Sequence, residues 1–159
     1  MLFLALVAAA WCALLAFAPL LPTPLAGVLY AVGSRICHQL PARSFHLEAA
    51  QLPVCARCLG IYAGAAAGAW AASFSVRVAG GVARWSPRNL LLAGAWPTAL
   101  TWTLEQSGAW GGSNFVRAGA GVPLGIAIAL VVARAVATLH YDECAPRRPI
   151  ANSQPPTPT

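Results

Sequence analysis

The residues of this chain whose types and spacing could do chemistry are gathered in one segment, residues 37–58. Three of the five cysteines and two of the three histidines lie there, namely Cys37, His38, His46, Cys55 and Cys58. Thiolate sulfur and imidazole nitrogen are ligands that zinc prefers, and a thiolate is also the nucleophile of disulfide exchange. The segment is therefore the candidate functional site.

A tetrahedral zinc site is the interpretation that these ligand types favour. Cys55 and Cys58 form a C-x-x-C pair. The adjacent Cys37 and His38 add a third sulfur and an imidazole, which completes the ligand set of many zinc sites. Because two adjacent residues rarely both reach one metal, His46 is an alternative fourth ligand. Four protein ligands leave no open position on zinc, so a structural or metal-handling role is favoured over hydrolysis.

A redox role is the main alternative, and it uses the same atoms. Cys55 and Cys58 could form a redox-active disulfide, with Cys37 as the resolving thiol, in a membrane thiol-disulfide oxidoreductase that passes electrons to a quinone. A second cysteine pair is not apparent, since Cys12 lies in an apolar stretch and Cys144 in the polar tail. An enzyme is therefore the weaker hypothesis. A purely structural disulfide that pins the loop is the third.

The position of the C-x-x-C pair predicts its acidity. The pair lies directly before an apolar stretch that should form a helix, so its thiols should lie at a helix N-terminus. The helix dipole and the neighbouring guanidinium of Arg57 both favour a negative charge there. We therefore expect Cys55 and Cys58 to have lowered pKa values.

Composition places the segment in a membrane protein. The chain has 159 residues, of which 58% are apolar and only 9% charged, and its mean hydropathy is +0.65. A soluble domain has about a quarter charged residues. The net charge of +6 therefore indicates membrane topology and contact with the lipid bilayer, and we expect no nucleic-acid partner.

The apolar stretches predict an all-α integral membrane bundle of about four transmembrane helices. The predicted spans are residues 1–21, 59–76, 89–104 and 115–140. Each approaches the roughly 20 residues that cross a bilayer. Residues 25–33 are apolar but too short to cross, and predict an extra or re-entrant helix before the Cys/His loop of residues 35–58. Residues 1–140 would form a single transmembrane domain. The proline-rich tail, residues 141–159, is expected to be disordered.

Arginines predict the orientation in the membrane. Those of the second loop and of the tail are Arg77, Arg84, Arg88, Arg147 and Arg148. With four spans these arginines share a side with the N-terminus, and the positive-inside rule makes that side cytoplasmic. We therefore expect an inner (cytoplasmic) membrane protein with both termini in the cytoplasm and the Cys/His loop outside. Arg35, Arg43 and Arg57 count against this orientation unless function holds them outside.

The first span resembles a signal peptide in one respect. Its Ala16-Phe17-Ala18 sequence fits the small-residue pattern of a cleavage site. No basic residue precedes the apolar run, however, and Pro19 follows the site directly. We therefore expect the span to be retained.

Three polar residues are expected at membrane depth on the same side as the Cys/His loop. Glu105 ends the third span, and Asn114 and Arg117 open the fourth. A carboxylate at that depth needs a partner, and Arg117 or Arg43 could provide the charge. An ion pair that locks the helical hairpin is the favoured interpretation; the alternative is a polar chamber beneath the thiols.

Small residues recur every fourth position in two of the spans. They are Gly60, Gly64, Gly68 and Ala72 in the second span, and Gly121, Gly125, Ala129, Ala133 and Ala137 in the fourth. Such ridges let two helix backbones approach closely. The pattern predicts close helix contacts, within one chain or in a helix-mediated homo-oligomer, although an alanine-rich helix also produces such ridges by chance.

Two sequence runs carry a family resemblance. CHQLPARSF at residues 37–45 and LPVCARCLGIYAG at residues 52–64 resemble the signature of a family of small prokaryotic membrane proteins known as domain of unknown function 2085. The resemblance covers most of residues 35–125. It implies a multi-span membrane protein with an important Cys/His segment, and it implies no settled activity.

The third span departs from the family pattern. Family members often carry an Asp-Gly pair there, with a Gln one turn later. The aligned residues here are Thr101, Trp102 and Glu105. The acid is displaced by one turn along the same helix face, because residues four apart are neighbours on a helix. A role that depends on the Asp is therefore in doubt for this chain.

Overall fold

The structure, a computed structural model, describes residues 2–74 and 85–144, with side chains described as far as residue 139. Apart from one short hairpin, the regular secondary structure of the described residues is helical, which confirms the predicted all-α class. Its helices are α1 (Leu2–Ala16), α2 (Thr23–Ile36), α3 (Ala56–Phe74), α5 (Pro87–Gln106) and α6 (Asn114–Cys144). Short 3-10 turns at Ala18–Leu20 and Pro41–Arg43 interrupt the connections.

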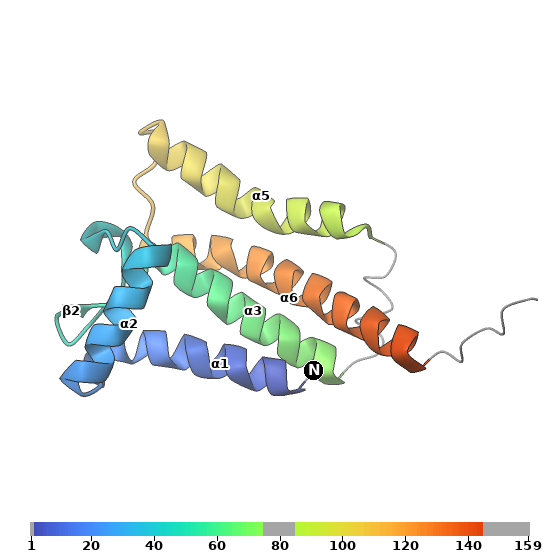
Figure 1. The fold of residues 1–159 in the computed structure, drawn as a ribbon. Coiled ribbons are helices and arrows are strands. Elements are labelled where there is room, and N and C mark those ends of the chain that lie inside the picture. The colour runs from blue at the N-terminus through green and yellow to red at the C-terminus, as the bar shows by residue number, and fades with distance from the viewer. Residues whose placement is uncertain (1, 75–84, 145–159) are drawn as a thin grey trace, which may run out of the picture.

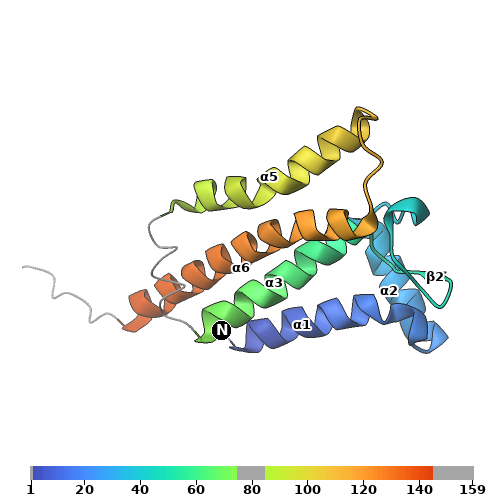
Figure 2. The same cartoon turned by 180° about the vertical axis from the view of Figure 1, so that it is seen from behind.

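Four of the helices lie side by side. In Figures 1 and 2 they follow one another in the order α1, α3, α6, α5, and α2 crosses the row at one end, beside the hairpin. The most extensive packing is that of α3 on α6, while α1 packs on α3 and α5 on α6. The loop that carries the cysteines lies at the end of the row where α2 crosses.

Glycines bring α3 and α6 into close contact. A methyl group at Gly60 or Gly64 would collide with backbone atoms of α6, and one at Gly121 or Gly125 would collide with backbone atoms of α3. The predicted small-residue ridges are therefore confirmed as a helix contact within one chain. Since these ridges already face each other, an association between copies of the chain would need a different face.

The predicted set of four spans is confirmed only in part. Of the described helices, α6 alone is long and apolar enough to cross a membrane by length and composition, over the 26 residues Asn114–Leu139. Helix α1 has 15 residues, a length of roughly 22 Å, against the roughly 30 Å of a hydrocarbon core. The predicted span 1–21 is shortened because a 3-10 turn with Pro19 at its start follows α1.

Helix boundaries differ from the predicted ones at several ends. Helix α3 begins three residues before the predicted span, so Cys58 lies inside it, and α5 extends beyond the predicted span 89–104 at both ends. The predicted disorder is wrong for residues 141–144, because α6 continues through Cys144 and the first proline after it is Pro146. The rest of the predicted tail, residues 145–159, lies outside the described residues, as do Arg77 and Arg84.

The short apolar stretch at residues 25–33 does form a helix, as predicted. Helix α2 begins at Thr23, has a proline in its first turn and extends to Ile36. Proline is favoured there because its missing N–H has no partner at a helix start. With 14 residues, α2 is too short to cross a bilayer.

Amide hydrogen bonds hold the Cys/His loop against α2. The Gln39 side chain donates to the carbonyls of Tyr30, at 3.0 Å, and Pro53, at 2.8 Å. The Gln51 side chain donates to the Gln39 carbonyl at 2.6 Å, and the Tyr30 hydroxyl donates to the Gln51 carbonyl. These bonds fix the two ends of the loop relative to each other, and those ends carry the cysteines.

The tip of the loop is a small hairpin. Its strands are β1 (His46–Leu47) and β2 (Ala50–Gln51), with His46 opposite Gln51. The turn between them uses Glu48 and Ala49 at φ values of 50° and 66°, a left-handed conformation that is uncommon for residues other than glycine. The hairpin places Glu48 and His46 on the surface.

Candidate functional site

Three cysteines meet where α2 ends and α3 begins. Cys37 follows the last residue of α2, Cys55 directly precedes α3, and Cys58 lies in the first turn of α3. All three are free thiols, and their Sγ atoms lie within 4.8 Å of one another. The structure therefore brings together all three predicted sulfur ligands; we refer to Cys37, Cys55 and Cys58 as the thiol cluster.

One hydrogen bond joins the two halves of the thiol cluster. The Cys37 Sγ accepts from the backbone N–H of Cys55 at 3.1 Å. The cluster also packs on apolar residues, since Cys37 forms a buried core with Leu15 of α1 and with Val54. The thiols therefore border apolar side chains on the side that faces α1.

Neither predicted imidazole joins the thiol cluster. His38 and His46 are both exposed, and the described group of ligand atoms that lie close together contains only the three sulfurs. The reason for His38 is local: Cys37 is in an extended conformation, with φ −145° and ψ 142°, and successive side chains of an extended chain point to opposite sides. His46 is held away in strand β1.

Cys55 is the acidic thiol of the C-x-x-C pair. The pKa of Cys55 is held well below its usual range, chiefly because the Cys58 thiol donates a hydrogen bond to it, with further bonds from the backbone N–H groups of Cys58 and Arg57 and from the Cys37 thiol. The prediction of a lowered pKa therefore holds for Cys55.

The guanidinium of Arg57 does not act on the thiols as predicted. It donates to Glu105 Oε1 at 3.1 Å and to the Thr101 hydroxyl at 3.4 Å. Arg57 lowers the pKa of Cys55 only through its backbone N–H. Successive residues of a helix point about 100° apart, so a neighbour of Cys58 in sequence faces a different helix, α5.

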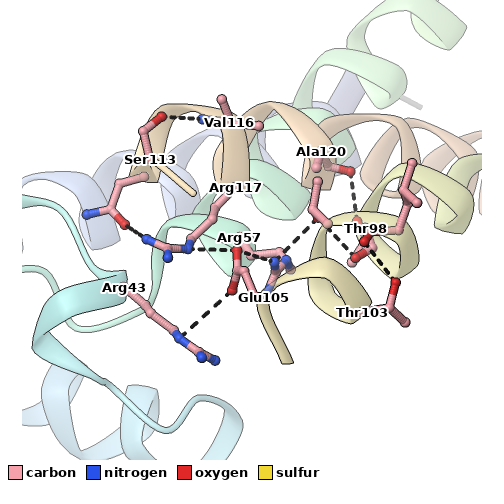
Figure 3. A network of polar contacts seen from close by, with 12 residues as sticks. Arg43, Arg57, Thr98, Thr103, Glu105, Ser113, Val116, Arg117 and Ala120 are labelled. Atoms are coloured by element: carbon pink, nitrogen blue, oxygen red, sulfur yellow. Dashed lines mark hydrogen bonds and ion pairs between the residues drawn. The ribbon is translucent and has the colours of Figure 1, made fainter. Parts of the chain in front are cut away.

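Glu105 is the centre of an ion cluster at the end of α5. Its side chain is only 3% exposed, and three arginines surround it. Arg117 Nε donates to Oε1 at 2.9 Å, and Arg43 Nε lies 3.9 Å from Oε2. Figure 3 shows these pairs meeting on the one carboxylate. Both predicted partners of Glu105 are thus confirmed, and Arg57 is a third.

Asn114 links this ion cluster to the Cys/His loop. Its side-chain oxygen accepts from Arg117 Nη1 at 2.8 Å, and its side-chain nitrogen donates to the Ser44 carbonyl at 2.9 Å. Ser44 is fully buried. The sequence did not point to Ser44 or to Gln39. The Ser44 carbonyl accepts a hydrogen bond, and the Gln39 side chain donates to the carbonyls of other residues. Only the folded loop brings these groups near each other.

The thiol cluster and the ion cluster border one cavity. It has a volume of about 360 Å³, and its walls come from the loop and from α2, α3, α5 and α6. The polar and sulfur-bearing residues that line it are Cys37, His38, Gln39, Arg43, Cys55, Arg57, Cys58, Gln106 and Arg117. The two interpretations of Glu105 therefore coexist: its ion pairs lock α3, α5 and α6 together, and the arginines of those pairs also form one side of a chamber beside the thiols.

A family comparison agrees with this assembly. A family model described as "Predicted membrane protein (DUF2085)" matches residues 37–131, which is more than half of the chain. The chain belongs to this family. The matched region begins at Cys37 and contains the whole thiol cluster and all members of the ion cluster. Membership and the length of α6 together support a membrane protein.

The other comparisons add little about function. The uncharacterised protein MJ1492 of Methanocaldococcus jannaschii is 58% identical over 40 residues, which are 25% of this chain and 26% of that protein. The chain thus matches only about a quarter of the length of that relative. No solved structure matches the chain.

Proposed function

We propose that the protein binds one zinc ion through Cys37, Cys55 and Cys58. The observation that supports this proposal is the gathering of three free thiols within 4.8 Å of one another. Zinc–sulfur bonds of about 2.3 Å in a tetrahedron separate the sulfurs by roughly 3.8 Å. Shifts of the order of 1 Å would therefore close the thiol cluster around an ion.

The fourth position on the metal distinguishes a structural role from a metal-handling one. His38 lines the same cavity as the thiol cluster and could complete a closed site if its side chain turned. With His38 in its present exposed position, the fourth site would face the cavity and take water or a ligand. We favour the second arrangement, because His38 is exposed. Sites that exchange ligands keep such an open position on the metal. The protein would then handle metal or act on a metal-bound ligand.

Thiol–disulfide exchange is the second candidate, and the placement of the C-x-x-C pair favours it. Cys55 lies at the N-terminal end of α3 and Cys58 in its first turn. The Cys55 thiolate would attack a substrate disulfide and release one substrate thiolate, leaving a mixed disulfide. Cys58 would lose its proton, attack the Cys55 sulfur and release the second substrate thiolate. The protein ends with a Cys55–Cys58 disulfide, and the substrate gains two electrons. In this direction the substrate disulfide, and not a quinone, accepts the electrons, and no described feature supports the quinone of the predicted alternative.

We also propose a location and an orientation in the membrane. Four helices, α1, α3, α5 and α6, would lie in the bilayer of the inner membrane, with both termini in the cytoplasm. Large apolar side chains face outward from each of them, for example Phe3 at 75% exposure, Phe74 at 68%, Trp96 at 68% and Phe115 at 79%. Such an apolar exterior is stable against lipid and unusual against water. Because α1 is short, it could cross only if the bilayer is locally thinner or if the turn that follows α1 also lies within the membrane.

Metal analysis of purified protein tests the two candidates. The protein would be purified in detergent without reductant, and zinc would be measured by elemental analysis beside free thiols. We expect near-stoichiometric zinc that Cys55→Ser and Cys58→Ser lose. Cys12→Ser is the matched control, because Cys12 is a free thiol of α1 outside the thiol cluster. Absence of zinc with a reducible Cys55–Cys58 bond would favour exchange, and absence of both would overturn both candidates.

A further inference from the structure

The cavity beside the thiol cluster carries more positive than negative charge. Arg43, Arg57 and Arg117 line it, and the carboxylate that they share is Glu105. Three guanidinium groups thus face one carboxylate, which leaves two positive charges without a counter-charge in the ion cluster. Arginine does not lose its proton in proteins, so a change of pH cannot remove the excess.

Among the described side chains, no second carboxylate pairs with these arginines. The acidic residues of the sequence are Glu48, Glu105, Asp142 and Glu143. Glu48 is exposed at the hairpin turn, and position 142 is roughly 37 Å from Arg117 along α6. One negative charge on the thiol cluster, from a Cys55 thiolate or from zinc held by three thiolates, would offset one of the two charges. The cavity would still be positive.

Arg43 has donors that the protein does not use. Its Nε lies 3.9 Å from Glu105, and its two Nη nitrogens have no hydrogen-bond partner among the described residues; in Figure 3 they lie on the far side of that pair. Arg117, by contrast, uses its three nitrogens on Glu105, Asn114 and Gly111. A free pair of Nη groups is suited to a two-pronged bond to a carboxylate or a phosphate.

We propose that this cavity binds the oxyanion group, a phosphate or a carboxylate, of a small amphiphilic ligand through Arg43 and Arg57. Apolar walls from Ile61 of α3 and Trp102 of α5 would hold the ligand's apolar part. The volume of about 360 Å³ lies within the range of small-molecule sites. Because the thiols line the same cavity, the bound ligand lies beside them. The proposal does not require a metal in the thiol cluster.

A soluble anion and a lipid headgroup share this chemistry, so the test has two arms. The full-length protein in detergent, stripped of metal by a chelator, would be titrated calorimetrically with inorganic phosphate and with benzoate at constant ionic strength. The second arm titrates short-chain phosphatidylglycerol against phosphatidylcholine. We expect saturable binding that Arg43→Gln weakens about tenfold or more, because the variant removes the charged two-pronged donor.

Arg35→Gln is the matched control, since Arg35 is exposed in the last turn of α2 and does not line the cavity. It should bind like the wild type, and Arg43→Lys should fall between the two. Binding of phosphate or benzoate identifies a soluble ligand, and binding of phosphatidylglycerol alone identifies a headgroup. If no probe binds, or if Arg43→Gln and Arg35→Gln bind equally, the proposal is overturned.

Thiol protection tests the position of the bound ligand. The saturating probe should slow the modification of Cys55 by N-ethylmaleimide in the metal-free protein, because the ligand and Cys55 share the cavity. The modification of Cys12 in the same sample is the internal control and should keep its rate. An unchanged rate at Cys55 while the probe is bound would place the ligand elsewhere and overturn the proposal.

Discussion

Arg57 of α3 and Glu105 of α5 form a hydrogen-bonded ion pair at 3.1 Å, and Arg57 also lines the cavity that the thiols share. This pair connects two helices that do not pack on each other extensively, because α6 lies between them. Arg117 of α6 bonds to the same oxygen of Glu105. The carboxylate therefore fixes the ends of three helices around the chamber.

Removal of the Glu105 charge should destabilise the protein strongly. Glu105→Gln keeps the size of the side chain but leaves three arginines around a neutral group, two of which are largely buried. An uncompensated buried charge costs about 3–5 kcal/mol. Unfolding in detergent, followed by circular dichroism with increasing denaturant, measures the loss. Glu48→Gln, at an exposed turn position, is the control and should unfold like the wild type; equal stability of the two variants would contradict this role of Glu105.

The pairing of Glu105 could be predicted from the sequence, but its full geometry could not. A carboxylate at the end of an apolar stretch needs a cation, and Arg43 and Arg117 were available on the same side. Arg57 lies between the two cysteines in sequence, and this position alone favours the thiols as its partners. The turn of about 100° per helical residue directs its side chain toward α5 instead.

The thiol cluster was predictable for a similar reason, and the position of His38 relative to it was not. The spacing of Cys55 and Cys58 before an apolar stretch already predicts both at a helix start. The direction of the His38 side chain depends on the backbone at Cys37, which is extended, and on the hydrogen bonds of Gln39 that hold the loop against α2. Such amide-to-carbonyl bonds leave no periodic signal in a sequence.

The glycine contact between α3 and α6 should not tolerate a side chain. Gly64→Ala places a methyl group against the backbone of α6 near Val122, so the two helices must move apart, at a cost of about 1–3 kcal/mol. Gly119→Ala is the matched control in α6, because a methyl group there meets nothing within 4 Å. Alanine is the better helix former by about 1 kcal/mol, so the control should be neutral or slightly stabilised. Unfolding midpoints of the two variants in the same detergent compare them, and an equal or higher midpoint for Gly64→Ala would contradict the packing.

The metal-free protein should be alkylated at Cys55 at unusually low pH. A lowered pKa means that the folded protein holds the thiolate at pH values where an ordinary thiol, with a pKa of about 8.5, is protonated. The alkylation rate at Cys55 should therefore stay nearly constant from pH 8 down to about 6.5, whereas that of an ordinary thiol falls about tenfold per pH unit. Iodoacetamide modification followed by mass spectrometry of each cysteine measures both.

The pairing of the thiols provides the control for this pH dependence. In Cys58→Ser the Cys55 sulfur loses its main hydrogen-bond donor, the Cys58 thiol, and a serine hydroxyl restores it only in part. The rate profile should shift toward higher pH. A thiol whose pKa is lower in the folded than in the unfolded state stabilises the fold fully at a pH above the unfolded pKa. This stabilisation is lost as the pH falls from the unfolded pKa through the folded one. The metal-free wild type should therefore also lose stability on acidification through the pKa of Cys55. A rate that falls tenfold per unit below pH 8 in the wild type would refute the lowered pKa.

The orientation of α6 decides which compartment the chamber faces. Asn114, at the N-terminal end of α6, bonds to the Cys/His loop, whereas Cys144 is the last residue of the same helix, roughly 45 Å away along its axis. If α6 crosses the membrane, the loop and Cys144 lie on opposite sides.

A membrane-impermeant maleimide added to intact cells should label Glu48→Cys, at the exposed hairpin turn, and should label Cys144 only after the membrane is opened. The two would be compared in chains whose other cysteines are replaced by serine. Labelling of both from outside would show that α6 does not cross, and labelling of Cys144 alone would place the chamber in the cytoplasm, where a structural disulfide at the thiol cluster is not expected.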